Sequence, residues 1–229
     1  MKIKSHIPNT ITLLNLLSGV VGIIWVLDGN ILSGAYFIIL AAVFDFFDGF
    51  AARLLNVQGE IGKQLDSLAD LISFGVLPGM ILFQMAKANN GIEWLSYLTL
   101  IIPVFSAVRL AKFNIDTRQS DRFIGLPTPA NALFISTLPY FAIKWSSTGV
   151  WLTSTLFLVG IAWIFAILLV AELPLIALKF KSYSFAANKF RYALLATGLI
   201  LILSLGLAGI PLVIVAYLGL SIIENRINT

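Results

Sequence analysis

Long apolar runs that are almost free of charge dominate this sequence and limit what it can fold into. A helix needs about 20 mostly apolar residues to cross a membrane. Eight segments approximately meet this requirement: residues 8–27, 31–55, 62–86, 94–114, 128–145, 150–171, 192–207 and 210–223. Only Ala208 and Gly209 separate the last two segments, which are open to interpretation as one long kinked helix. We predict an all-α bundle of about eight membrane spans, with six or seven as alternatives.

The composition excludes several other classes of protein. Charged residues make up 11% of the chain and apolar residues 59%, whereas soluble domains carry about 25% charged residues. The chain has no cysteine and one histidine, His6, which excludes disulfide frameworks, thiol nucleophiles and cysteine-based zinc sites. The apolar run that follows the basic N-terminus is too long for a signal peptide. We therefore expect a single integral membrane domain over residues 1–229.

Basic residues are distributed unevenly between the predicted loops. If the N-terminus is cytoplasmic and there are eight spans, 13 of the 15 lysines and arginines fall on the cytoplasmic side, and only Lys87 and Lys144 on the other. Cytoplasmic loops of membrane proteins are enriched in lysine and arginine. The pattern thus predicts that both termini are cytoplasmic. It also accounts for the net charge of +4 without a nucleic-acid partner.

Four aspartates lie within residues 42–75, inside the second and third predicted spans. Asp45 and Asp48 are three residues apart and Asp66 and Asp70 four apart, so each pair shares a helix face. Acids inside a membrane cost about 2.5–3.5 kcal/mol each, and divalent cations are a natural compensation. Carboxylate clusters suit Mg²⁺, Mn²⁺ or Ca²⁺. Sites with two such ions typically catalyse displacement at phosphorus.

The spacing of these acids resembles the signature of the CDP-alcohol phosphotransferase family. It reads Asp45-x2-Asp48-Gly49-x2-Ala52-Arg53-x8-Gly62-x3-Asp66-x3-Asp70 and matches the family pattern at every fixed position. Members are integral membrane enzymes that transfer a phosphatidyl-type group from a CDP-linked lipid to an alcohol and release CMP. The resemblance implies that the four aspartates hold two divalent cations, Mg²⁺ or Mn²⁺ with Ca²⁺ as a further possibility. It also implies that Asp70 is the catalytic proton acceptor.

The resemblance also implies a set of residues that bind the CDP-lipid. They are the glycines and arginine of the signature region, together with a Pro-Asn-x-x-Thr element that opens the first span: Gly49, Arg53, Gly59, Gly62, Asn9 and Thr12. Each has a plainer alternative. Small residues such as Gly49 and Ala52 also pack helices together, and an arginine extends its charge to the membrane surface. Asparagine and threonine near a helix start also act as caps.

Two further stretches resemble the phosphatidylserine synthase branch of the family: residues 109–114, RLAKFN, and 125–131, GLPTPAN. This likeness implies CDP-diacylglycerol as donor and L-serine as acceptor, with phosphatidylserine and CMP as products. Serine carries a carboxylate, which Arg109 and Lys112 are suited to bind. Asn114, Thr128 and Asn131 are candidate neutral partners. The alternative is that Arg109 and Lys112 have no ligand and only contribute to the excess of basic residues on the cytoplasmic side.

The resemblance covers residues 1–145, which we predict to be the catalytic core, with residues 146–229 forming additional spans. It also implies a homodimer among the lipids of the cytoplasmic membrane, with the active site facing the cytoplasm. Two other functions stay open. The same chemistry is possible on glycerol 3-phosphate or an inositol phosphate. Acids inside a membrane also mark ion pathways, which leaves a cation- or proton-coupled transporter, although the chain shows no internal repeat.

Overall fold

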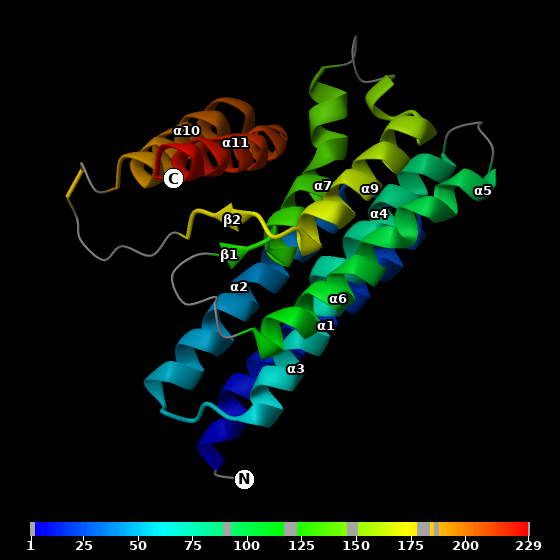
Figure 1. Ribbon diagram of the computed structural model, residues 1–229. Coiled ribbons are helices and arrows are strands. Elements are labelled where there is room, and N and C mark those ends of the chain that lie inside the picture. The colour runs from blue at the N-terminus through cyan, green and yellow to red at the C-terminus, as the bar shows by residue number, and fades with distance from the viewer. Residues whose placement is uncertain are drawn as a thin grey trace.

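A computed structural model describes residues 3–88, 93–116, 123–145, 151–177, 184–185 and 188–228 of the chain. Over these residues the fold is a bundle of helices (Figure 1). Its first half comprises η1 Ile3–Ser5, α1 His6–Leu27, α2 Ser33–Leu54, α3 Glu60–Asp70, η2 Leu71–Val76, α4 Leu77–Lys87, α5 Glu93–Ser96, η3 Tyr97–Leu100 and α6 Ile101–Ile115. Its second half comprises α7 Thr128–Lys144, α9 Thr155–Val170, α10 Lys189–Leu205, η5 Gly206–Gly209 and α11 Ile210–Asn228.

Within the described residues, each of the eight predicted segments contains a helix. Five stretches are long and apolar enough to cross a membrane: His6–Leu27, Ser33–Leu54, Glu60–Lys87, Glu93–Ile115 and Lys189–Ile227. α9 is also apolar, but it begins at Thr155, later than the predicted start at residue 150. These stretches indicate an integral multi-pass membrane protein. The all-α class predicted from the apolar runs is confirmed.

The last two helices form a hairpin, so the alternative of one long kinked helix is wrong. Gly206, which ends α10, has φ +62° and ψ −140°, a backbone conformation that is open essentially to glycine alone. A Cβ added to Gly209 would lie 2.8 Å from the carbonyl carbon of Leu201, so only glycine fits this close return of the chain. Gly198 of α10 faces Val213 of α11, whose Cγ1 would lie 3.6 Å from a Cβ placed there. α10 and α11 therefore pack against each other along their length.

Glycines bring α1 and α2 into close contact with the third helical stretch. A Cβ on Gly22 of α1 would lie 2.7 Å from the side chain of Leu77, and one on Gly34 of α2 would lie 2.5 Å from that of Ile81. Leu77 and Ile81 are fully buried. This packing places the start of α1, the end of α2 and the start of α3 at the same end of the bundle (Figure 1).

One short antiparallel strand pair interrupts the helical pattern within the described residues. β1 Phe123–Ile124 precedes α7, and β2 Pro174–Leu175 follows α9. Phe123 pairs with Leu175, and Ile124 pairs with Pro174. Strands of two residues are too short to show the apolar–polar alternation that predicts a strand, so the sequence pattern does not predict them. The pair links the chain segments on either side of α7 and α9 (Figure 1).

Candidate functional site

Three of the four predicted aspartates form a compact cluster between α2 and α3. Asp45, Asp48 and Asp66 each offer a carboxylate oxygen, and these oxygens all lie within 4.8 Å of one another. Oδ2 of Asp48 and Oδ1 of Asp66 are buried and have no hydrogen-bond partner among the described residues. Buried oxygens that repel one another and lack a donor are the ligands that a hard divalent cation satisfies. The cluster therefore fits a divalent-metal site.

Asp70, the fourth aspartate, lies one turn further along α3 and outside this compact cluster. It is buried, and its Oδ1 accepts a hydrogen bond of 3.2 Å from Nδ2 of Asn15. It remains within electrostatic range of Asp45, Asp48 and Asp66. Asn15 belongs to α1 and was not among the predicted site residues. A polar amide in the middle of an apolar span is the signal in the sequence that would have identified it.

The turn that follows Asp70 departs from α-helical geometry. Residues Leu71–Val76 form a π-helical segment, an arrangement that is frequent at functional sites. Oγ of Ser73 in this segment donates to the carbonyl oxygen of Asn15 at 2.9 Å. A Cβ on Gly19 would lie 2.9 Å from Cα of Ser73, so α1 and the π-helical segment meet backbone to backbone. This contact holds Asn15 against Asp70.

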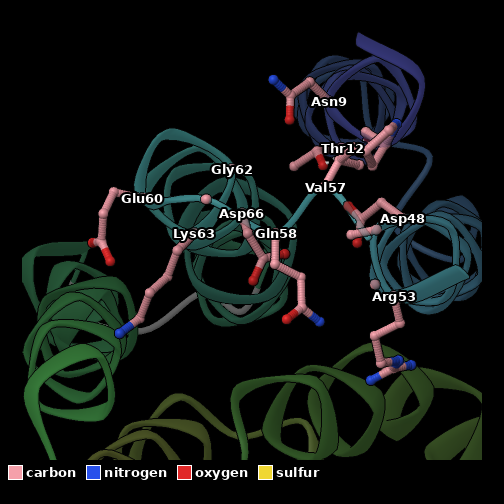
Figure 2. Close-up of a pocket in the computed structure, with 14 residues that line it drawn as sticks. Asn9, Thr12, Asp48, Arg53, Val57, Gln58, Glu60, Gly62, Lys63 and Asp66 are labelled. Carbon is pink, nitrogen blue, oxygen red and sulfur yellow. Dashed lines mark hydrogen bonds between the residues drawn. The ribbon is translucent and has the colours of Figure 1, made fainter. Parts of the chain in front are cut away.

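A pocket of about 450 Å³ opens beside the aspartate cluster (Figure 2). Asp48 and Asp66 reach its wall from α2 and α3. Its lining also includes all six residues that were predicted to bind the CDP-lipid: Asn9, Thr12, Gly49, Arg53, Gly59 and Gly62. Lys63 completes the basic groups of the lining, on the opposite side of the view from Arg53. Carboxylates, the two basic side chains of Arg53 and Lys63, and accessible backbone therefore line one cavity.

The glycines of this pocket face open space. A Cβ on Gly49 would have only Arg53 Nη2 within 4 Å, at 3.9 Å. A Cβ on Gly62 would meet Oδ1 of Asn9 at 3.5 Å, and one on Gly59 would meet no described atom within 4 Å. The helix-packing alternative is therefore wrong for Gly49. The missing side chains leave room for a ligand to approach the backbone.

Asn9 and Thr12 do not cap the first helix. α1 begins at His6, with Ser5 at the N-cap position, so both residues lie inside the helix. Oγ1 of Thr12 donates to the carbonyl oxygen of Pro8 at 3.1 Å, within the same helix. The capping alternative is wrong. Figure 2 shows Asn9 and Thr12 on α1 at the edge of the pocket.

Three of the five residues predicted to bind the acceptor are buried. Arg109, Thr128 and Asn131 are 6%, 1% and 0% exposed. Nε of Arg109 donates to the carbonyl oxygen of Leu126 at 2.7 Å, and its guanidinium lies within electrostatic range of Asp70. Both amide atoms of Asn131 lack a hydrogen-bond partner among the described residues. Arg109 is thus a buried cation close to the fourth aspartate.

The other two acceptor candidates have different surroundings. Lys112 is exposed on α6, although it lies only three residues beyond Arg109. Nδ2 of Asn114 donates to Oγ of Ser67 at 2.8 Å, and the backbone carbonyl oxygen of Asn114 accepts from Nζ of Lys63 at 2.6 Å. These bonds tie α6 to α3. The structure therefore does not bring Lys112 and Asn114 together with Arg109.

Comparison with known proteins connects this site to a family. Residues 5–168 match the family model described as CDP-alcohol phosphatidyltransferase. The chain belongs to this family. The matched CDP-alcohol phosphatidyltransferase region contains the aspartate cluster, Asp70, the pocket and Arg109. Family membership implies an enzyme whose substrates are a CDP-alcohol and an acceptor, and it places the chain in phospholipid synthesis.

Several curated CDP-alcohol phosphatidyltransferases are similar to the chain. A CDP-diacylglycerol–serine O-phosphatidyltransferase of Bacillus subtilis is 36% identical over 137 residues, which cover 59% of this chain and 76% of the relative. One of Mycobacterium leprae is 32% identical over 178 residues, or 74% of this chain and 57% of the relative. An archaetidylserine synthase of Methanothermobacter thermautotrophicus is 36% identical over 141 residues. The chain spans little more than half the length of the last two relatives.

Proposed function

We propose that this enzyme transfers a phosphatidyl group from CDP-diacylglycerol to L-serine, giving phosphatidylserine and CMP. The observation that carries the proposal is the buried Arg109 within electrostatic range of Asp70, which lies one helical turn beyond Asp66 of the pocket. A buried guanidinium is a suitable partner for the carboxylate of serine. The names of the bacterial relatives, which are serine phosphatidyltransferases, support the same acceptor.

The donor is proposed to bind in the pocket of Figure 2. Arg53 and Lys63 bring positive charge to its walls, which suits the two phosphates of a CDP-lipid. The open space at Gly49, Gly59 and Gly62 lets the nucleotide or its phosphates approach the backbone. Asn9 and Thr12 supply polar contacts from α1.

Asp45, Asp48 and Asp66 would hold divalent cations, with Asp70 as a further ligand and two ions, Mg²⁺ or Mn²⁺, as the proposed number. When bound, such ions neutralise the negative charge of the phosphates and of the departing CMP. The packed helices α2 and α3 hold these carboxylates in place, because side chains on helices are positioned more precisely than side chains on loops.

Asp70 is proposed to accept the proton of the serine hydroxyl group. The hydroxyl oxygen attacks the lipid-linked phosphorus, the bond from that phosphorus to the CMP oxygen breaks, and CMP leaves with the electron pair. Asn15 binds one oxygen of Asp70 and so orients the other toward the acceptor. Arg109 binds the serine carboxylate, and Thr128 and Asn131 line the same region of α7.

The reaction is proposed to take place at the cytoplasmic face of the cell membrane. Serine is water-soluble and the donor is a lipid, so the site must be open to both phases. The basic residues of the predicted loops gather on the side of the N-terminus, which favours the cytoplasm. The pocket lies at this same end, because Asn9 near the start of α1 lines it.

A comparison of acceptors in one purified preparation tests the proposal. The enzyme would be given CDP-diacylglycerol with serine, glycerol 3-phosphate or an inositol phosphate as the sole acceptor, and CMP release would be measured. We expect turnover with serine alone. Phosphorylated alcohols carry more negative charge and need more cations, whereas Lys112 beside Arg109 is turned to the exterior. A preference for a phosphorylated alcohol would refute serine as acceptor, and absence of CMP release with every acceptor would refute CDP-diacylglycerol as donor.

A further inference from the structure

Side chains on one face of α11 form hydrogen bonds with the chain segment that follows α9. Tyr217, Ser221 and Asn225 are spaced four residues apart and share this face. The hydroxyl of Tyr217 donates to the carbonyl oxygen of Ile176 at 3.2 Å, and Oγ of Ser221 accepts from the backbone N–H of Ile176 at 3.2 Å. Nδ2 of Asn225 donates to the carbonyl oxygen of Pro174 at 2.6 Å. The C-terminal hairpin therefore binds the backbone of residues 173–177, which we call the strap.

A further contact from α10 strengthens this attachment. Nε of Arg191 donates to the carbonyl oxygen of Ala177 at 3.0 Å, and its Nη1 lies 3.9 Å from Oε1 of Glu224. The side chains of Arg191 and Glu224 are 18% and 13% exposed, so this ion pair is largely shielded from solvent. Both helices of the hairpin thus hold the strap.

The strap in turn fixes the backbone that binds Arg109. Gly125 donates its N–H to the carbonyl oxygen of Leu173 in the strap at 2.9 Å, directly after the β1–β2 pairing. The next residue, Leu126, donates its N–H to the carbonyl oxygen of Leu168 at 2.8 Å. The carbonyl oxygen of Leu126 accepts the 2.7 Å hydrogen bond from Nε of Arg109. Hydrogen bonds, joined by the backbone of the strap and of Gly125–Leu126, therefore connect α11 to the guanidinium.

We propose that the C-terminal hairpin is a positioning element for the acceptor site, acting through the strap on Arg109. Leu126 is the one residue described in the structure that accepts a hydrogen bond from this guanidinium. The bond uses Nε and leaves the two terminal nitrogens for a planar, two-point contact with a carboxylate. Because the carbonyl of Leu126 sets the plane of the group, a displaced strap turns those nitrogens away from the acceptor. The proposal rests on the proposed function in assigning Arg109 to the acceptor.

The test is a double variant that loosens the strap and leaves the pocket intact. Ser221→Ala with Asn225→Ala removes two side-chain bonds to the strap and keeps Tyr217, which itself lies within electrostatic range of Arg109. We expect the KM for serine to rise about tenfold, because each lost neutral hydrogen bond weakens the attachment by up to about tenfold. The KM for CDP-diacylglycerol and the melting temperature should change little. Ser204→Ala is the matched control, since Oγ of Ser204 binds only carbonyl groups of its own helix.

A double-mutant cycle with Arg109→Ala separates positioning from a structural effect. If the hairpin acts on Arg109 through the strap, the Ser221→Ala, Asn225→Ala pair should not lower kcat/KM for serine further once Arg109 is alanine. An equal loss in both backgrounds, an unchanged KM for serine, or a joint fall of all kinetic constants with the melting temperature would each overturn the proposal. The acceptor panel on the unaltered enzyme decides the proposed function separately. If another alcohol proves to be the acceptor, the same cycle is measured with that alcohol.

Discussion

At the scale of single residues, the unpaired oxygens of Asp48 and Asp66 lead to the most direct prediction. Each is buried without a hydrogen-bond donor, and a bound cation would supply the compensating charge that both carboxylates lack. Asp48→Asn and Asp66→Asn should each lower turnover by more than about 100-fold, since even groups that only orient a metal ligand affect affinity about 10- to 100-fold. Calorimetric titration with Mn²⁺ and an assay of CMP release would measure binding and turnover.

A matched carboxylate supplies the control for these variants. Asp28 directly follows α1 at its other end and is exposed, so Asp28→Asn should leave Mn²⁺ binding and turnover unchanged. Excess EDTA should abolish the activity of the unaltered enzyme, and added Mn²⁺ or Mg²⁺ should restore it. Full activity in EDTA would contradict the metal site.

A second residue-scale prediction concerns the space at Gly49. Gly49→Ala would place a methyl group in the pocket, with only Arg53 Nη2 nearby. Alanine favours a helix over glycine by about 1 kcal/mol, so the fold should be retained or slightly stabilised. The KM for CDP-diacylglycerol should nevertheless rise, by about tenfold if the methyl group costs the donor about 1.4 kcal/mol.

Gly160 is the control for this effect. It lies in α9, and a Cβ there would meet no described atom within 4 Å, so Gly160→Ala has the same influence on helix stability away from the pocket. Steady-state kinetics and thermal unfolding of both variants would be compared. An unchanged KM for the donor in Gly49→Ala would mean that the nucleotide does not approach this backbone.

At the scale of secondary-structure elements, the contact between α1 and the π-helical segment supports Asp70. Gly19→Ala would bring a Cβ to 2.9 Å from Cα of Ser73 and 3.0 Å from its backbone nitrogen. Backbone atoms cannot move aside as a side-chain end can, and overpacking of this kind costs about 1–3 kcal/mol. The two elements should separate, and the bond from Asn15 to Asp70 should lengthen.

The expected result for Gly19→Ala is a lower unfolding temperature together with a lower kcat. Gly219→Ala in α11 is the comparison, because a Cβ there meets no described atom within 4 Å. Thermal unfolding in detergent and CMP release under saturating substrates would measure the two effects. A normal kcat in a destabilised Gly19→Ala enzyme would show that α1 does not position Asp70 for the reaction.

At the scale of the whole molecule, the absence of cysteine makes the orientation in the membrane directly testable. Lys4→Cys and Asn90→Cys would each introduce the single thiol of the chain, the second at a position outside the described residues. Positive-inside topology predicts that a membrane-impermeant maleimide labels Lys4→Cys only from the cytoplasmic side and Asn90→Cys only from the opposite side. The reverse pattern would place the pocket away from cytoplasmic serine.

Much of the fold and of the candidate site followed from local pattern. Apolar runs of about 20 residues predict helices that cross a membrane, and helix geometry alone puts Asp45 and Asp48 on a shared face. Such features depend on residues within a few turns of one another, where the backbone geometry is regular. The CDP-lipid candidates came instead from the resemblance to the family signature, and all of them line a single pocket.

The tertiary structure decided what depends on contacts between distant residues. Arg109 and Lys112 are both basic residues near the end of one apolar run, yet Arg109 is buried and Lys112 is exposed. The reason is that only Arg109 packs against the residues that precede α7, where it binds Leu126. Asp70 is set apart from the other aspartates by Asn15, which is 55 residues away in the chain. The strap is connected to Arg109 through the backbone of Gly125 and Leu126. Periodicity describes the surface of one helix, and only packing determines which neighbour each part of that surface meets.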